Sequence, residues 1–214
     1  MKNNITIVGA GLVGSLCAIY MTKRGHRVTI FERRKDLRSE IITAGKSINL
    51  ALSERGWTAL KKVGIDQQVM KIAIPMYKRI MHDMGGNLSE QPYGNQGQAI
   101  YSVSRAQLNV LMMEIAEKNG ATLHFNEKCV DANLEEAIAT FENTKIATKQ
   151  EISADLLIGA DGSLSVVREQ MVKKYQHEYQ YNEIGHDYKE LLIPAGKNGT
   201  HLLDKNALHI WPRG

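Results

Sequence analysis

The sequence predicts an α/β fold that begins with a strand–helix–strand (βαβ) unit, and three observations support this prediction. Residues 5–8 are all β-branched, which favours a short buried strand. The next six residues, Gly9-Ala-Gly-Leu-Val-Gly14, match the pattern G-x-G-x-x-G. A second strand, over 27–31, ends at the acid Glu32, which lies 18 residues after Gly14. A strand, a glycine turn, a helix and an acid in this order predict a dinucleotide site.

Each glycine of this pattern has a physical reason. Gly9 permits the tight turn, Gly11 allows the backbone to approach a pyrophosphate, and Gly14 allows the helix to pack close to the strand. The helix is expected to run to about Arg24, with a glycine after it that suits a helix C-terminus. The Glu32 carboxylate would accept hydrogen bonds from ribose hydroxyls and repel a 2′-phosphate, which favours NAD or the adenosine half of FAD.

The same N-terminal stretch has an alternative interpretation. Residues 5–21 contain no charge and follow Lys2 closely, as in a secretory signal or a membrane anchor. The run ends in Met21-Thr-Lys-Arg-Gly25 instead of a small-residue cleavage site. Three glycines within six residues also disfavour a membrane helix. The βα interpretation is therefore preferred.

Composition indicates an ordinary globular protein. The chain has 214 residues, 43% hydrophobic and 23% charged, which suits one large domain, or one domain and part of another. The net charge of +4 is compatible with an anionic ligand, but the basic residues are too scattered to predict nucleic-acid binding. Cys17 and Cys129 show no disulfide pattern, and the seven histidines lack metal-ligand spacing. We expect a cytoplasmic protein without a metal.

After Glu32 the chain departs from the regular βα alternation of nucleotide dehydrogenases. The charged segment 33–38 predicts a solvated loop for Lys35, Asp36 and Arg38, whereas Arg33 and Arg34 could instead flank an adenine or a phosphate. A strand, turn and helix are expected over 155–168. The remaining expected elements are helices over 54–64, with Ser53 as N-cap, and 105–119, and strands over 76–84, 99–103, 121–125, 191–193 and 208–210.

These motifs together resemble the FAD-dependent aromatic hydroxylases, which are single-component flavin monooxygenases. The resemblance rests on Gly9–Gly14 with Glu32, on Ser104-Arg105 opening a helix, and on Asp155-Leu-Leu-Ile-Gly-Ala-Asp-Gly162 with Arg168. Within that family, several stretches are most similar to the members that hydroxylate kynurenine. These stretches are 46–56 (KSINLALSERG), Ile74-Pro-Met76 with Arg79, Gln91-Pro-Tyr-Gly94, 101–109 (YSVSRAQLN) and 208–213 (LHIWPR).

The resemblance implies an FAD site. It places the pyrophosphate against the glycine turn, the adenosine ribose at Glu32 and Arg33, and the adenine near the backbone of Cys129. Arg105 would grip the phosphates, since a guanidinium binds phosphate bidentately, although from the residues alone it could be a first-turn surface arginine. The implied cofactor residues are Gly9, Gly11, Val13, Gly14, Glu32, Arg33, Ala51, Arg105, Cys129 and Asp161.

The resemblance also implies a substrate and a reaction. Arg79 and Tyr93 match residues that bind the carboxylate of L-kynurenine, and Arg with a phenol supplies charge-assisted hydrogen bonds for it. From the residues alone, Arg79 would be a solvated strand residue. The implied reaction is the FAD- and NADPH-dependent hydroxylation of L-kynurenine by O₂ to 3-hydroxykynurenine, a step of tryptophan degradation and NAD biosynthesis. No catalytic acid or base is evident.

The sequence departs from this family in two respects. Lys46 stands where family members have arginine, and the chain ends at Trp211-Pro-Arg-Gly214 without the family's second FAD motif. We therefore expect a truncated aromatic-hydroxylase fold, a Rossmann-like FAD-binding domain with inserted mixed and antiparallel β segments, which is the N-terminal portion of a longer enzyme. Membrane association through a missing C-terminal region and the oligomeric state stay open.

Two alternatives are a non-catalytic nucleotide-binding module and another flavin-dependent oxidoreductase on the same fold. The expected division is 1–72 and 105–174 for the FAD-binding part, and 73–104 and 175–214 for the substrate-domain strands, the last segment cut off.

Overall fold

A computed structural model describes residues 2–39, 48–176, 179–180, 182–186, 189 and 191–212. The chain divides into two compact units, which are described separately. Unit 1 comprises residues 1–42 and 109–188, and unit 2 comprises residues 43–108 and 189–214. Gly45, Lys46, Ser47 and the end of the chain from Arg213 lie outside the described residues. The division into FAD-binding and substrate-binding segments stays a prediction.

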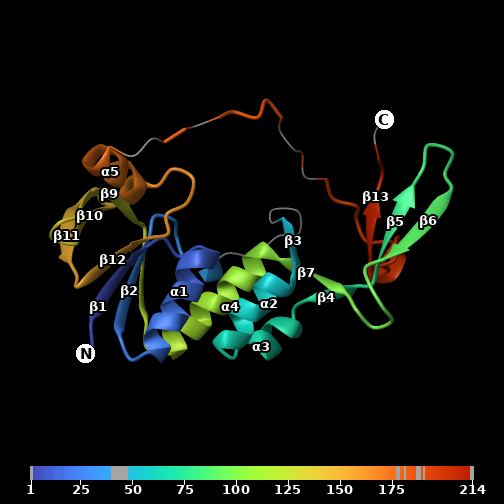
Figure 1. The fold of residues 1–214 in the computed structure, drawn as a ribbon, viewed down its shortest axis with the longest axis horizontal. Helices are drawn as coiled ribbons and strands as arrows, with labels where there is room; N and C mark the ends of the chain where they lie inside the picture. Colours follow the sequence, from blue (N-terminus) through green and yellow to red (C-terminus); the bar gives the residue numbers. More distant parts are fainter. Residues whose placement is uncertain are drawn as a thin grey trace. The chain divides into compact units, whose positions relative to one another are not determined.

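Unit 1 is built on a four-stranded parallel sheet (Figure 1). Its strands, in spatial order, are β12 (Leu156–Gly159), β1 (Asn4–Val8), β2 (Arg27–Glu32) and β8 (Thr122–Phe125). The chain moves outward from β1 to β2 and β8, and then returns to the other side of β1 as β12. The order therefore reverses between β1 and β12, and in parallel sheets ligands bind beyond the carboxyl ends of the strands at such a point.

Helix α1 (Leu12–Lys23) follows β1 directly and packs on the sheet, which confirms the predicted βαβ unit. Ala18 and Ile19 of α1 are fully buried. The helix ends as predicted: Gly25 has a φ of +85°, and its N–H donates to the carbonyl of Thr22 at 2.8 Å. Only a residue that tolerates a left-handed conformation fits this position well.

Two further helices belong wholly or partly to unit 1. Helix α4 (Arg105–Lys118) lies within the range predicted for it, and the boundary between the units falls inside it. Its residues Met112 and Met113 are buried. Helix α5 (Val166–Tyr175) begins after Ser165, whose hydroxyl accepts a hydrogen bond from the N–H of Arg168 at 3.0 Å. This is the usual N-cap arrangement.

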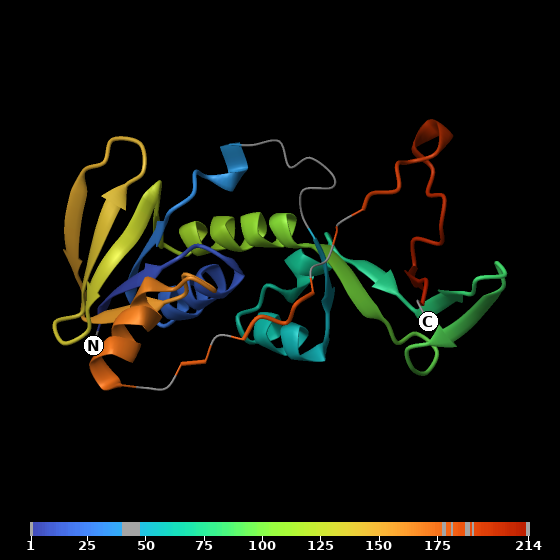
Figure 2. The same ribbon diagram turned by 90° about the horizontal axis from the view of Figure 1, so that it is seen from above.

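A second sheet of unit 1 was not predicted from the sequence. It is antiparallel and consists of β9 (Glu127–Asn133), β10 (Ile138–Asn143) and β11 (Lys149–Ser153). Figure 2 shows it, in yellow and gold, at the same end of unit 1 as α5. Phe141 of β10 is fully buried, and its ring stacks on Phe31 of β2 at 4.1 Å. This apolar contact, which also includes Cys129, packs the second sheet against the first.

The described residues of unit 2 form two small sheets, two short α-helices and the first turn of α4. Antiparallel strands form the first sheet, and the second is mixed, because β13 runs parallel to β5 while β6 runs antiparallel. This confirms the predicted mixed and antiparallel insertion. The elements are β3 (Asn49–Leu52), β7 (Ile100–Ser104) and β4 (Ile74–Met76) in the first sheet, β13 (Ala207–Ile210), β5 (Lys78–His82) and β6 (Leu88–Pro92) in the second, with α2 (Glu54–Lys62) and α3 (Asp66–Met70).

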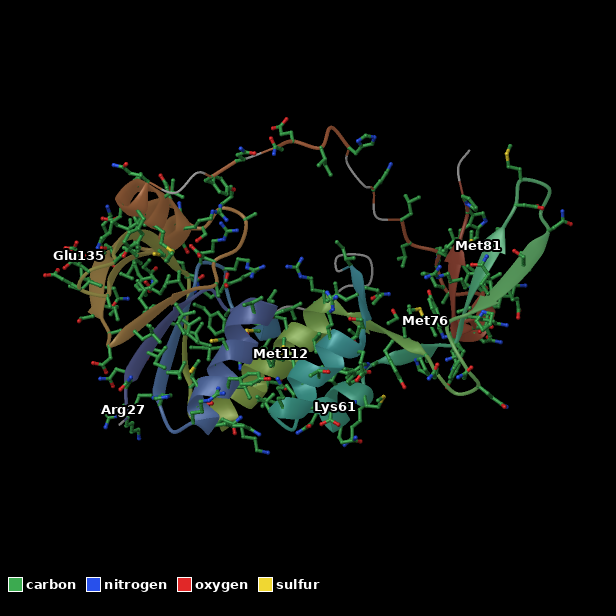
Figure 3. All side chains as sticks on the ribbon, in the orientation of Figure 1. Arg27, Lys61, Met76, Met81, Met112 and Glu135 are labelled. Carbon is green, nitrogen blue, oxygen red and sulfur yellow. The ribbon has the colours of Figure 1, made fainter. Side chains whose placement is uncertain are left out.

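Three details of unit 2 differ from the sequence prediction. The strand predicted over 76–84 is divided into β4 and β5 at Tyr77, and Met76 and Met81 therefore lie on different sheets (Figure 3). Residues 191–193 are not a strand, whereas 208–210 are one, as predicted, and pair with β5. Ser53 occupies the N-cap position of α2, but its side chain makes no capping hydrogen bond.

No helix among the described residues is long and apolar enough to cross a membrane. The described part of the chain also contains no group of three or more His, Cys, Asp or Glu side chains arranged to hold a metal ion.

Candidate functional site

The glycine turn between β1 and α1 lies at the carboxyl end of β1, and its three glycines differ in what surrounds them. A Cβ on Gly9, whose φ is +100°, would lie 2.5 Å from the carbonyl oxygen of Ala160, and one on Gly14 would lie 1.9 Å from that of Gly9. A Cβ on Gly11 would meet no atom of the described residues within 4 Å, its chain neighbours aside. The chain's own packing therefore requires Gly9 and Gly14, whereas Gly11 leaves open space of the kind that a ligand would fill.

The start of α1 is suited to an anion. Gly11 is the N-cap and makes no side-chain capping bond, and the first turn contains no acidic residue. The N–H groups of a first helical turn lack partners within the helix and lie at the positive end of its dipole. Val13 in this turn is exposed. A phosphate at this position would find free donors and a favourable field.

Glu32 at the end of β2 is buried, and its own chain already engages both carboxylate oxygens. Oε2 accepts from the N–H of Ala10 at 2.9 Å, and Oε1 accepts from the backbone N–H and the Nε of Arg34 at 3.0 and 2.7 Å. Burial raises the pKa of Glu32, but the hydrogen bonds from Arg34 and Ala10 outweigh it and hold the pKa below its ordinary value. The carboxylate is therefore ionised at neutral pH and keeps lone pairs for a ribose hydroxyl.

The structure places Arg34, and not Arg33, beside this acid. The Arg34 guanidinium forms an ion pair with Glu32 at 2.7 Å. Both arginines are exposed, and among the described residues no ion pair joins Arg33 to Glu32. Spacing alone leaves both arginines as candidates, and the resemblance names Arg33, whose role at the ribose stays a prediction. Successive residues after a strand point in different directions, and the direction depends on the turn.

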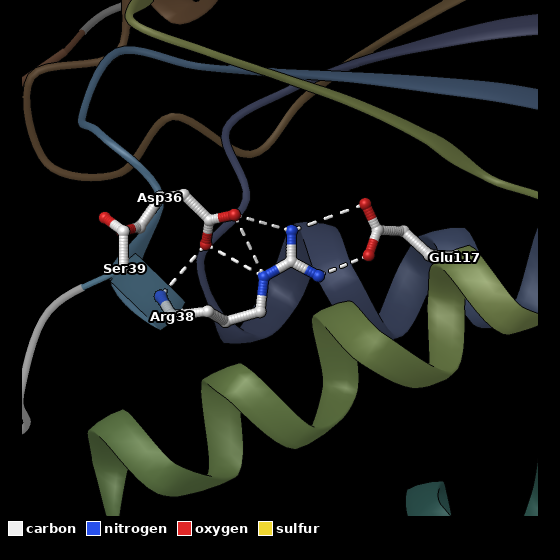
Figure 4. Close-up of polar contacts among 4 residues, drawn as sticks. All are labelled: Asp36, Arg38, Ser39 and Glu117. Atoms are coloured by element: carbon white, nitrogen blue, oxygen red, sulfur yellow. Dashed lines mark hydrogen bonds and ion pairs between the residues drawn. The ribbon is translucent and has the colours of Figure 1, made fainter.

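Residues 36–38 are not the solvated loop that the sequence suggested. Arg38 forms an ion pair with Asp36 at 2.7 Å and a second one with Glu117 of α4 (Figure 4). The Arg38 guanidinium carbon also lies 5.5 Å from the centroid of the Phe125 ring. Only 24% of the Arg38 side chain is exposed. Contacts with α4 and β8, which are distant in sequence, cause this difference.

Asp161 follows β12 and lies next to the glycine turn, because its Cα would be 3.0 Å from a Cβ on Gly9. Its Oδ2 accepts from the N–H of Val166 at 2.7 Å, at the start of α5. Its Oδ1 is buried and has no hydrogen-bond partner among the described residues. A buried carboxylate oxygen without a partner is costly, so this oxygen fits a donor supplied by a ligand.

Cys129 lies in β9 with its thiol inside the core. Burial, with a smaller effect from the nearby charge of Asp161, raises the pKa of this thiol to about 12. The side chain is thus a protonated, inert part of the core at neutral pH. The proposed approach of the adenine to the backbone at this position stays a prediction.

Ala51 and Arg105 belong to unit 2. Ala51 is exposed on β3 and pairs with Ser102 of β7, and Arg105 begins α4. The backbone N–H of Arg105 donates to the carbonyl of Ile48 at 3.1 Å, and its side chain is exposed. The cofactor roles expected for both residues stay predictions.

Arg79 and Tyr93, the two residues expected to bind the substrate, lie together in unit 2. Arg79 is on β5, and Tyr93 follows β6 with its N–H donating to the carbonyl of Tyr77 at 3.0 Å. The Arg79 guanidinium carbon is 4.9 Å from the centroid of the Tyr93 ring. The Tyr93 hydroxyl is buried and has no hydrogen-bond partner among the described residues. A guanidinium and an unpartnered phenol, side by side, can bind a carboxylate.

Two polar residues around the glycine turn escaped the sequence analysis. Asn109 of α4 and Ser15 of α1 are both buried and donate hydrogen bonds to the carbonyl of Ala10. A signal for Asn109 was present, since it is a polar residue among the apolar positions of a helix. Such residues are hydrogen-bonded when buried, but the sequence does not show to what.

Comparison with known proteins agrees with this fold. Residues 2–187 match the family model described as "FAD binding domain". Among solved structures, the flavin-dependent monooxygenase PieE in complex with FAD and substrate has a TM-score of 0.66, with 19% identity, over 80% of this chain and 32% of that chain. A 2-methyl-3-hydroxypyridine-5-carboxylic acid oxygenase has a TM-score of 0.65, with 22% identity, over 80% of this chain and 42% of that chain. At these identities the likeness shows the fold alone.

Sequence relatives confirm the resemblance to kynurenine hydroxylases. Kynurenine 3-monooxygenase from Christiangramia forsetii is 46% identical over 100% of this chain and 47% of its own length. The enzymes named kynurenine 3-monooxygenase from Anopheles gambiae and Sus scrofa are 42% and 40% identical, each over 99% of this chain and over 44% and 45% of their own lengths. The chain thus spans about half the length of these relatives. Because the family model covers most of the chain, this protein belongs to the FAD-binding domain family.

Proposed function

We propose that this chain is the FAD-binding and substrate-carboxylate-binding part of a monooxygenase that hydroxylates L-kynurenine to 3-hydroxykynurenine, a step of tryptophan degradation, with NADPH and O₂ as co-substrates. The observation that supports the substrate most directly is the pairing of Arg79 with Tyr93, 4.9 Å from guanidinium carbon to ring centroid, with the phenol hydroxyl left without a partner among the described residues. Eight relatives that are 40–46% identical over 98–100% of this chain have the name kynurenine 3-monooxygenase.

The cofactor part of the proposal rests on the carboxyl ends of β1 and β12. The uncapped first turn of α1 and the open space at Gly11 suit a pyrophosphate, and Glu32 suits a ribose. The free oxygen of Asp161 suits a hydroxyl of the same cofactor. FAD, when bound, supplies the redox chemistry that activates O₂, while the protein binds and orients it.

Two residues of this chain would bind the carboxylate of the substrate. Arg79 neutralises the carboxylate of the amino-acid group of kynurenine, and the Tyr93 hydroxyl donates a hydrogen bond to it. Both interactions are charge-assisted and therefore stronger than neutral hydrogen bonds. The cation–π contact with Tyr93 holds the Arg79 guanidinium in place before the substrate arrives.

Flavin absorbance and NADPH oxidation test the proposal. The purified chain is mixed with FAD and desalted, and NADPH consumption is then followed with and without L-kynurenine. Retained flavin and oxidation that kynurenine stimulates would support the proposal. Retained flavin with oxidation that kynurenine does not change would favour another flavin-dependent oxidoreductase, and binding of adenosine nucleotides without any oxidation would favour a non-catalytic module.

Binding of L-kynurenine to single variants tests the substrate site separately. Arg79→Ala should weaken kynurenine binding by roughly tenfold or more, the range expected for a lost charge-assisted hydrogen bond. The matched control is Arg27→Ala, because Arg27 is an exposed strand arginine of unit 1. Equal kynurenine affinity of the wild type and Arg79→Ala would refute the assigned role.

A further inference from the structure

The Ala10 peptide groups, in the middle of the glycine turn, are held on both sides by buried side chains. The N–H of Ala10 donates to Glu32 Oε2 at 2.9 Å. The carbonyl of Ala10 accepts from Asn109 Nδ2 at 3.0 Å and from Ser15 Oγ at 3.1 Å. Ala10, Ser15, Asn109 and Glu32 are 1%, 0%, 5% and 6% exposed, respectively. We call the side chains of Glu32, Asn109 and Ser15 the Ala10 clamp.

The clamp determines where the next amide points. A trans peptide is planar, so its C=O and N–H point in opposite directions, and the described residues contain no cis peptide bond. Asn109 and Ser15 hold the carbonyl of Ala10 toward the protein. The N–H of Gly11 lies in the same peptide plane and therefore points away from Asn109 and Ser15. Gly11 is also the glycine whose Cβ position faces open space.

Asn109 is an unfavourable choice for a residue that only fills the core. Its Oδ1 is buried and has no hydrogen-bond partner among the described residues. An unsatisfied buried acceptor destabilises a fold, whereas leucine has a similar size and no such atom. Among the described residues, the hydrogen bond that the Asn109 amide makes is its donation to the carbonyl of Ala10.

We propose that Asn109, assisted by Ser15, is a positioning residue that directs the Gly11 amide toward the pyrophosphate of the cofactor. This inference rests on the proposed FAD binding at the glycine turn. It assigns to a residue of α4, remote in sequence from the turn, an effect that is specific for the phosphate part of the ligand. A residue that merely stabilises the fold would affect every ligand part alike.

Three ligands separate these roles. The dissociation constants of FAD, ADP and adenosine are measured for the wild type, Asn109→Leu, Ser15→Ala and the control Gln107→Ala, an exposed position on the same helix. We expect Asn109→Leu to bind FAD and ADP roughly five- to tenfold more weakly, the effect of one net hydrogen bond, and to bind adenosine as the wild type does. Its urea midpoint should not fall, because the unsatisfied Oδ1 is removed. Ser15→Ala should show the same pattern with a smaller loss, and it serves alone if Asn109→Leu does not fold.

Unchanged affinities for FAD and ADP in folded Asn109→Leu would overturn the inference, as would an equal loss for all three ligands. If the wild type binds neither FAD nor ADP, the proposed function fails, and the clamp is then tested without ligand. In that case the ¹H–¹⁵N resonance and exchange rate of the Gly11 amide should differ between the wild type and Asn109→Leu, and identical values would overturn the inference.

Discussion

The carboxylate of Glu32 accepts a hydrogen bond from the backbone N–H of Ala10, with 2.9 Å between Oε2 and N. The acid at the end of β2 therefore holds the glycine turn that follows β1. A residue chosen from the sequence for its fit to a ribose thus has a second role toward its own chain. Because the carboxylate is buried and ionised, its charge contributes to the stability of the turn before any ligand binds.

This relationship predicts a pH-dependent contribution to stability. The pKa of Glu32 is lowered in the folded protein from its ordinary value of 4.5, so the ionised form favours folding. The stabilisation is fully present above the ordinary value and is lost as the pH falls through the lowered, folded value. The free energy of unfolding, from urea denaturation at pH 7 and at steps below pH 4.5, should fall more steeply in the wild type than in Glu32→Gln. Parallel curves would contradict this role.

Two neighbouring glycines should respond differently to alanine. Gly14→Ala places a methyl group 1.9 Å from the Gly9 carbonyl oxygen, and such overpacking costs about 1–3 kcal/mol or more. The methyl group of Gly11→Ala would have no neighbour within 4 Å among the described residues, and the backbone at Gly11, φ −71° and ψ −177°, suits alanine. We expect the free energy of unfolding of Gly11→Ala to lie within about 0.5 kcal/mol of the wild-type value. The variant should bind FAD more weakly. Urea denaturation and FAD titration measure both, and equal destabilisation by the two substitutions would refute the packing argument.

Removal of one oxygen atom from Tyr93 should separate folding from binding. The hydroxyl is buried without a partner among the described residues, so Tyr93→Phe should leave the free energy of unfolding unchanged or raise it by up to about 1 kcal/mol. The same variant should bind L-kynurenine more weakly, because the donor to the carboxylate is gone. Calorimetric unfolding and kynurenine titration test the pair of effects. A clear loss of stability would show that the hydroxyl serves the fold instead.

The Arg38 network should contribute more to stability than an ordinary surface ion pair. Arg38 bridges Asp36 and Glu117 and is only 24% exposed, so Arg38→Ala should destabilise the protein by about 1–2 kcal/mol. Lys173→Ala is the control, because Lys173 and its partner Glu169 are both about 60% exposed. That substitution should cost less than about 0.5 kcal/mol. Similar urea midpoints for the two variants would exclude a stabilising network.

Local patterns explain what could be predicted from the sequence. The βαβ unit, its helix end at Gly25 and the helix over 105–118 depend on neighbouring residues, and the structure confirms them. The resemblance names Arg79 and Tyr93 as substrate residues, and that role stays a prediction. Their contact depends on the pairing of β5 with β6, which the structure provides.

Long-range packing explains what could not be predicted. Burial alternates along β10, where Ala139 and Phe141 are buried, but the packing of this sheet depends on the contact of Phe141 with Phe31. Arg38 pairs with Glu117, 79 residues away, and Asn109 donates a hydrogen bond to Ala10, 99 residues away. No local pattern predicts such partners.

The most direct test of the central claim, that the glycine turn binds FAD, is the titration of FAD into the purified chain by flavin fluorescence, alongside Gly11→Ala. We predict saturable binding with a stoichiometry of about one, competition by ADP, and a clear loss of affinity in Gly11→Ala at unchanged stability. A folded wild-type chain that binds no FAD, or that binds it equally well with alanine at position 11, would contradict the account.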